Sequence, residues 1–134
     1  MFKTGLIYSL VLLVGLLSPI QAGLNSMLSK YTGHPLTAAV WNSFTAALFF
    51  FFFIIIFKVP IPTMSIFTAA PIWVFLGGIC GASFVLVGLV FAPQIGALFF
   101  MSLVITGTFI MSILLDRYGL VGYPVRPINT WRLL

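Results

Sequence analysis

Two carboxamide side chains lie inside the first long apolar stretch of the sequence. Gln21 and Asn25 are four residues apart, and Ser18 and Ser29 continue the same spacing on either side. In a helix, residues three, four and seven apart share one face, so these side chains form a single polar stripe. An unpaired amide in hydrocarbon costs several kcal/mol. The stripe must therefore face a neighbouring helix or a water-filled cavity.

Two interpretations of this stripe stay open. Gln21 and Asn25 could hold helices together, because interhelical hydrogen bonds in membranes contribute about 0.6–2 kcal/mol each. They could instead line a polar cavity for a small substrate. Pro19 favours a cavity, because it removes one backbone hydrogen bond and predicts a local kink beside Gln21. The two roles are compatible, and both carboxamides are candidate substrate-binding residues.

Four further candidates for substrate binding lie in later apolar stretches. Trp41 and Asn42 follow Pro35 by about two turns, roughly 9 Å at 1.5 Å per residue, which is deep for an interfacial tryptophan. The Trp41 indole could stack on a substrate or fill a gap between helices. Ser102 and Thr106 are one turn apart and could line the same cavity. Hydroxyls in membrane helices also commonly bond back to the carbonyl four residues earlier, which leaves a purely local role open.

Glycines mark a candidate helix-packing face. Gly77 and Gly81 form a small-xxx-small pair, and Gly88 falls on the same face of the helix. Such small residues let the backbones of membrane helices approach closely. Because glycine offers no side-chain chemistry, the three residues are predicted to pack against a helix.

Several classes of site are missing from the sequence. The apolar stretches contain no Asp, Glu, Lys or Arg, so the intramembrane carboxylate that proton-coupled transport commonly uses is absent. One Cys, one His and one acidic residue are too few and too far apart for a metal site. A serine hydrolase would have only His34 as a base. The basic residues are scattered singly, unlike a nucleic-acid surface. The sequence predicts no enzyme, no metal or other cofactor, and no nucleic-acid partner.

Composition identifies the elements that must carry these residues. Of the 134 residues, 62% are hydrophobic and only 5% are charged, whereas a soluble domain has about a quarter charged residues. A membrane helix needs about 20 mostly apolar residues. Four stretches satisfy this, separated by Pro- and Gly-containing breaks such as "APQIG" at 92–96: residues 6–29, 35–57, 72–91 and 95–115. We predict an all-α integral membrane bundle of four transmembrane helices, forming one domain over residues 1–134.

The distribution of basic residues predicts the orientation in the bilayer. Four spans place the N-terminus, the 58–71 loop and the 116–134 tail on one side, which then holds Lys3, Lys58, Arg117, Arg126 and Arg132. The other side holds only Lys30. By the positive-inside rule, the N-terminus and the start of the tail are cytoplasmic.

Three stretches carry a family resemblance: "SPIQAGLNSMLSKYTGHPLTAAVWNSF", "WVFLGGICGASFVLVGLVFAPQIGAL" and "LLDRYGLVGYPVRPINTWRLL". They resemble the YdcZ family of bacterial inner-membrane exporters, within the drug/metabolite transporter superfamily, over nearly the whole chain. The resemblance implies a unit of five spans, with the fifth following "NTWRLL". We therefore expect this chain to lack the last helix of the family unit.

The resemblance and the residues together suggest a function. Transporters commonly combine two repeats around a substrate site near the membrane midplane, and the sequence has no internal repeat. We expect a transporter half-unit in the bacterial inner membrane that exports a small metabolite or drug by alternating access. Its partner would be a second copy or a related membrane chain, giving a homodimer or a heterodimer. The alternative is a non-transporting membrane subunit or assembly protein, including an inactive truncated transporter.

Overall fold

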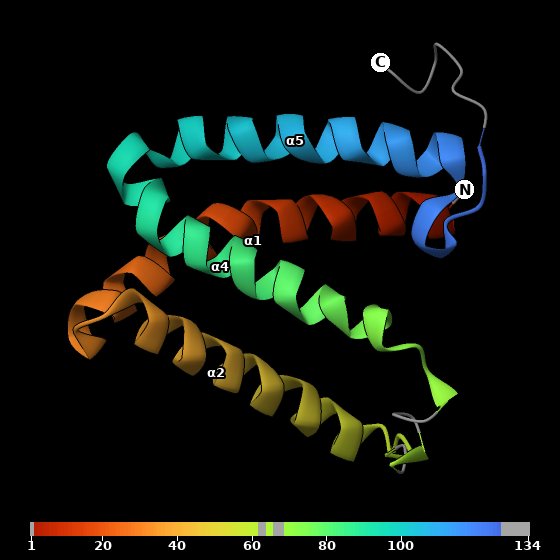
Figure 1. Ribbon diagram of the computed structural model, residues 1–134, viewed down its shortest axis with the longest axis horizontal. Coiled ribbons are helices and arrows are strands. Elements are labelled where there is room, and N and C mark those ends of the chain that lie inside the picture. Colours follow the sequence, from red (N-terminus) through yellow and green to blue (C-terminus); the bar gives the residue numbers. More distant parts are fainter. Residues whose placement is uncertain (1, 62–63, 66–68, 127–134) are drawn as a thin grey trace. The chain divides into compact units, whose positions relative to one another are not determined.

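The computed structural model describes residues 2–61, 64–65 and 69–126. The described residues form four long helices: α1 (Phe2–Thr32), α2 (Pro35–Ile56), α4 (Leu76–Ile95) and α5 (Ala97–Tyr118) (Figure 1). Two short 3₁₀ turns, η1 (Ile72–Phe75) and η2 (Leu120–Gly122), precede α4 and follow α5. These described residues contain no strand, and the four helices, the third taken together with η1, are long and apolar enough to cross a membrane. The predicted all-α membrane fold is confirmed.

Three helices, α1, α4 and α5, end later than the sequence predicts, whereas α2 ends one residue earlier. α4 continues through Pro93 to Ile95, so the break predicted at 92–96 is confined to Gly96, where φ is 87°. A proline near the end of a helix removes one backbone hydrogen bond but leaves the earlier turns intact. Gln94, predicted to lie in that break, is helical and donates its Nε2 hydrogen to the Val90 carbonyl, 2.9 Å away. Pro19 likewise lies inside α1, which runs unbroken for 31 residues.

The turn between α1 and α2 is closed by side chains. The Thr32 hydroxyl donates to the Leu28 carbonyl at 3.1 Å, and Gly33 adopts a φ of 74°. His34 Nδ1 then accepts the Leu36 backbone N–H at 3.1 Å and caps α2. Pro35 takes the first helical position, as predicted, because its missing N–H would have no partner there.

The chain divides into two compact units, Met1–Ala97 and Leu98–Leu134. In the first unit, α1, α2 and α4 all contact one another. The buried residues of this unit lie near the 33–34 turn, at the end of α1, the start of α2 and the end of α4: Ala22, Asn25, Ala38, Gly88, Leu89 and Ala92. Small side chains let the three helices meet there. Toward their other ends α1 diverges from α2 and α4 (Figure 1), and the large apolar side chains there are exposed.

The second unit consists of α5 and a short returning segment. Gly119 ends α5 in the left-handed conformation, with φ of 62°, and its N–H donates to the Leu115 carbonyl at 2.9 Å. The segment then turns back through η2, and the Arg126 backbone N–H donates to the Asp116 carbonyl at 2.8 Å. The Arg117 guanidinium lies 5.6 Å from the centre of the Tyr118 ring.

Candidate functional site

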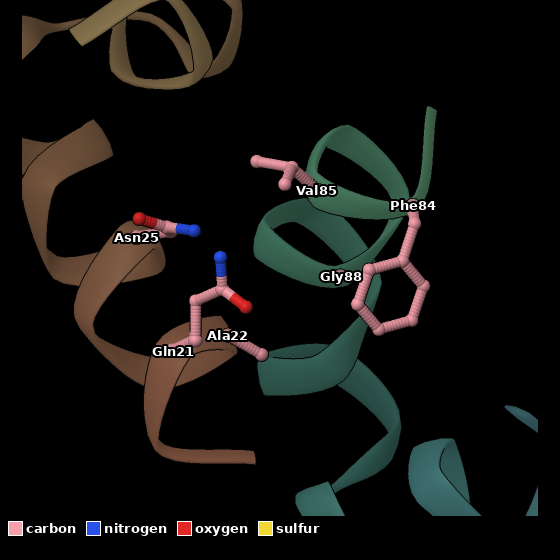
Figure 2. A pocket seen from close by; sticks show the side chains of 6 residues that line it. All are labelled: Gln21, Ala22, Asn25, Phe84, Val85 and Gly88. Atoms are coloured by element: carbon pink, nitrogen blue, oxygen red, sulfur yellow. The ribbon is translucent and has the colours of Figure 1, made fainter. Parts of the chain in front are cut away.

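A pocket lies between α1 and α4 in the first unit. It is lined by Gln21, Ala22 and Asn25 from α1 and by Phe84, Val85 and Gly88 from α4 (Figure 2). The two sets have the same spacing: in each, the last residue follows the other two by four and three positions, which places it on the same helix face as both. The cavity volume is about 10 Å³, which is room for about one water molecule, and the rest of the hollow is open at its mouth.

The two carboxamides form the polar wall of this pocket. Asn25 is only 6% exposed, whereas Gln21 is exposed at the pocket mouth. Both turn their amide ends into the space between the helices (Figure 2). Within the described part of the chain, neither amide has a hydrogen-bond partner, and no fully enclosed side-chain polar atom lacks one. The Asn25 amide is therefore available to a molecule in the pocket.

The α4 wall of the pocket is apolar, and at Gly88 it has no side chain. Phe84 and Val85 present hydrocarbon, and Gly88 is buried with no side chain to close the space opposite α1. None of the lining residues is ionisable. The pocket thus offers hydrogen bonds on one side and an uncharged, apolar surface on the other.

Trp41 and Asn42 are not among the residues that line this pocket. Trp41 is 53% exposed on α2 and packs edge-on against Phe44, with ring centres 5.8 Å apart. Asn42 is half-buried, one turn beyond the fully buried Ala38. Their roles in substrate binding remain predictions.

Ser102 and Thr106 belong to the second unit, on α5, and their hydroxyls bond to their own helix. The Ser102 hydroxyl donates to the Leu98 carbonyl at 2.9 Å, and the Thr106 hydroxyl donates to the Ser102 carbonyl at 2.7 Å. Each hydroxyl proton is thus already engaged, which is the local role described for such residues in membrane helices. Their lone pairs stay available as acceptors.

The three glycines of α4 have different surroundings. Gly88 is buried at the pocket, but Gly77 and Gly81 are exposed, and a Cβ at either would find nothing within 4 Å among the described residues. Only the Gly88 end of the predicted packing face is covered within this unit. Packing of the Gly77 and Gly81 end remains a prediction that requires a partner outside this unit.

A comparison with known families decides the kind of protein. The family model described as "Putative inner membrane exporter, YdcZ" matches residues 6–134. The chain belongs to the YdcZ family. With four helices long and apolar enough to cross a membrane, this YdcZ protein is a multi-pass inner-membrane protein, and its family is described as one of exporters. No curated protein and no solved structure matches the chain.

In this YdcZ chain, the sequence alone did not single out Phe84 and Val85 as pocket residues. The available signal was their spacing, since they precede Gly88 by four and three residues and so share its helix face. Apolar residues in a membrane helix give no indication of whether they face lipid or protein. Only the contact of α1 with α4 makes that distinction.

Proposed function

We propose that this YdcZ chain is a transporter half-unit that exports a small uncharged solute by alternating access after pairing with a second unit. The observation that carries the proposal is the Asn25 amide, which is 6% exposed, has no partner among the described residues and faces a pocket. No fully enclosed side-chain polar atom among the described residues lacks a partner, so the Asn25 amide can be reached from the pocket by water or by a solute. In a chain of an exporter family, such an accessible amide is suited to bind a passing solute.

The charge of the solute follows from the composition of the spans. Residues 59–115 contain no charged side chain, and α1 has none between Lys3 and Lys30. An ion held between these helices would have no counter-charge in a low-dielectric environment, which is strongly unfavourable. Gln21 and Asn25 instead provide neutral donors and acceptors.

The need for a second unit follows from how little of the first unit is buried. Its buried residues lie near the 33–34 turn, and the remaining helix surfaces are exposed and apolar. Alternating access generally moves one unit against another around a site between or within them. We infer that a second copy or a related membrane chain supplies the other unit.

The orientation fits export from the cytoplasm. We infer from the basic residues that the N-terminus is cytoplasmic, so the 33–34 turn lies on the periplasmic side. The first unit is then closed at its periplasmic end and diverges toward the cytoplasm, where an exporter collects its solute.

The test uses inside-out membrane vesicles containing the full chain and a panel of uncharged metabolites and drugs. Paired Gln21→Leu and Asn25→Leu substitutions should abolish accumulation of any solute that the wild-type chain accumulates, with insertion in the membrane unchanged. Gln94→Leu is the matched control, because it removes a carboxamide from α4 outside the pocket.

Two results would contradict the proposal. One is that the double variant accumulates the solute to the same level as the wild-type chain. The other is a double variant that loses self-association while the wild-type chain accumulates nothing, which would support the alternative of a non-transporting assembly subunit.

A further inference from the structure

We propose that the α1–α4 pocket selects solutes that carry an uncharged amide edge, meaning a carbonyl next to an N–H, on an apolar or aromatic body. The inference rests on the proposed function of the site, but it concerns which chemistry binds there. It can be tested by binding alone, without a transport assay.

The polar wall has the hydrogen-bonding pattern of an amide. Each carboxamide offers one carbonyl acceptor and two N–H donors, and Gln21 and Asn25 are one helical turn apart with their amide ends in the same space (Figure 2). A ligand that both donates and accepts along one edge can satisfy either carboxamide in two hydrogen bonds. A ligand with only an acceptor or only a donor leaves part of a buried amide unpaired, which is penalised.

The opposite wall determines the rest of the ligand. Phe84 and Val85 offer an aromatic ring and a branched hydrocarbon, and Gly88 adds no side chain to this wall. An aromatic ring in the ligand can pack against Phe84 in an offset or edge-on arrangement. Because the cavity volume is only about 10 Å³, about that of one water molecule, only the amide edge enters, and the body of the ligand lies at the open mouth.

Charge is the sharpest discriminator. The lining contains no ionisable side chain, so a cation or an anion of the same shape would lose its hydration without gaining a counter-ion. Benzamide, benzamidine and benzoate share one ring and one planar substituent but are neutral, cationic and anionic at neutral pH. The structure predicts binding of benzamide and exclusion of the other two.

The experiment measures saturation transfer from the full chain in lipid nanodiscs to each of the three compounds by NMR, with titration to obtain affinities. We expect a signal for benzamide only. Asn25→Leu should weaken benzamide binding at least about tenfold, the scale of one lost buried hydrogen bond. Gln94→Leu, which removes a carboxamide bonded to its own helix, should bind as the wild type does. A melting curve establishes that each variant is folded.

If Asn25→Leu does not fold, Gln21→Leu gives the same test, because Gln21 is exposed and its loss leaves the helix contacts in place. The proposal is overturned if no compound binds, which would mean that the pocket holds water only, or if all three bind alike. It is also overturned if neither pocket variant weakens benzamide. Loss of transport in the Gln21→Leu, Asn25→Leu double variant together with absent benzamide binding would leave the exporter proposal intact and remove only this one.

Discussion

Asn25 on α1 and Gly88 on α4 lie on opposite walls of one pocket, so a buried amide faces a residue that has no side chain. Helices that are held together by polar side chains place a donor opposite an acceptor. Here the described residues provide no partner for the amide. The proposed binding site and interhelical hydrogen bonding predict opposite effects of mutation at Asn25.

The first prediction concerns the stability of Asn25→Leu. Because the amide has no partner among the described residues, an apolar side chain of similar shape should leave the free energy of unfolding unchanged or raise it by up to about 1 kcal/mol. Interhelical hydrogen bonding would instead predict a loss of about 0.6–2 kcal/mol. Reversible unfolding of the purified chain in mixed micelles, followed by circular dichroism, measures the difference.

Ala38→Leu provides the positive control for that measurement. Ala38 is fully buried on α2, and extra methylenes in a packed site typically cost about 1–3 kcal/mol. If Asn25→Leu destabilises the chain as much as Ala38→Leu does, Asn25 has a structural role and the pocket reading fails.

The second prediction compares two glycines of the same helix. Gly88→Ala adds a methyl group at the buried wall of the pocket and should reduce transport, either by narrowing the pocket or by pushing α4 away from α1. Gly78→Ala adds the same group where nothing lies within 4 Å. It should raise stability by up to about 1 kcal/mol through helix propensity, with transport unchanged. Equal transport by the two variants would show that the space at Gly88 has no function.

The third prediction concerns the hydroxyls of α5. Ser102→Ala and Thr106→Val should retain most transport activity, because both hydroxyl protons already bond to carbonyls of α5. Removing such a local bond generally changes helix stability by only a few tenths of a kcal/mol, since back-bonded hydroxyls slightly destabilise helices. Initial rates of solute accumulation in inside-out vesicles measure the effect. A severe loss of rate with normal expression would place these hydroxyls on the solute pathway after all.

The fourth prediction concerns the return of the chain after α5. Gly119→Ala should open this segment, because the residue has a φ of 62° and a Cβ there would lie 2.7 Å from Val125 Cγ2. Gly122→Ala has comparable backbone strain, with a φ of 83°, but open space. Hydrogen exchange at the Arg126 amide, which donates to the Asp116 carbonyl, should therefore accelerate more in Gly119→Ala. Equal acceleration would show that strain alone, without the contact, determines the effect.

The polar stripe of α1 shows how far the sequence could predict the site. Helical spacing placed Gln21 and Asn25 on one face, and the structure brings both to one pocket. Spacing could not predict which helix contacts that face. Polar atoms in a membrane helix require a partner, but the pattern does not identify the helix that supplies it. Spacing also could not predict whether Trp41 is buried or exposed. Trp41 lies one turn from the buried Ala38, yet it is mostly exposed.

The ends of the helices show a different limit. Pro35 was correctly predicted to start α2, since proline suits the first helical position. The same residue type misled at Pro93, where α4 continues to Ile95. Pro93 is third from the end of the helix and removes only the hydrogen bond to the carbonyl four residues earlier, so the preceding turns stay intact. Gly96, with its positive φ, is the actual end of the helix.

The last prediction determines how two copies are oriented. Cys80 is exposed on α4, between Gly77 and Gly81, whose face has no neighbour in the first unit. If copies insert in one orientation and pair through this face, the two Cys80 thiols lie at the same depth. Oxidation with copper phenanthroline should then give a disulfide-linked dimer, because disulfides require Cα atoms within about 7 Å. In an antiparallel pair the thiols would be separated by roughly 16 Å along the helix axis, at 1.5 Å per residue.

Gly81→Leu should reduce this crosslink, because a large side chain keeps the helix backbones apart. Gly5→Leu is the matched control on α1, where a Cβ likewise meets nothing within 4 Å. Amine-reactive crosslinking identifies dimers in which the two Cys80 thiols lie too far apart to form a disulfide. Dimers captured through amines but never through Cys80 would contradict a parallel pair on this face. They would instead favour a partner of opposite orientation, and the five-to-one bias in basic residues makes that partner a different chain.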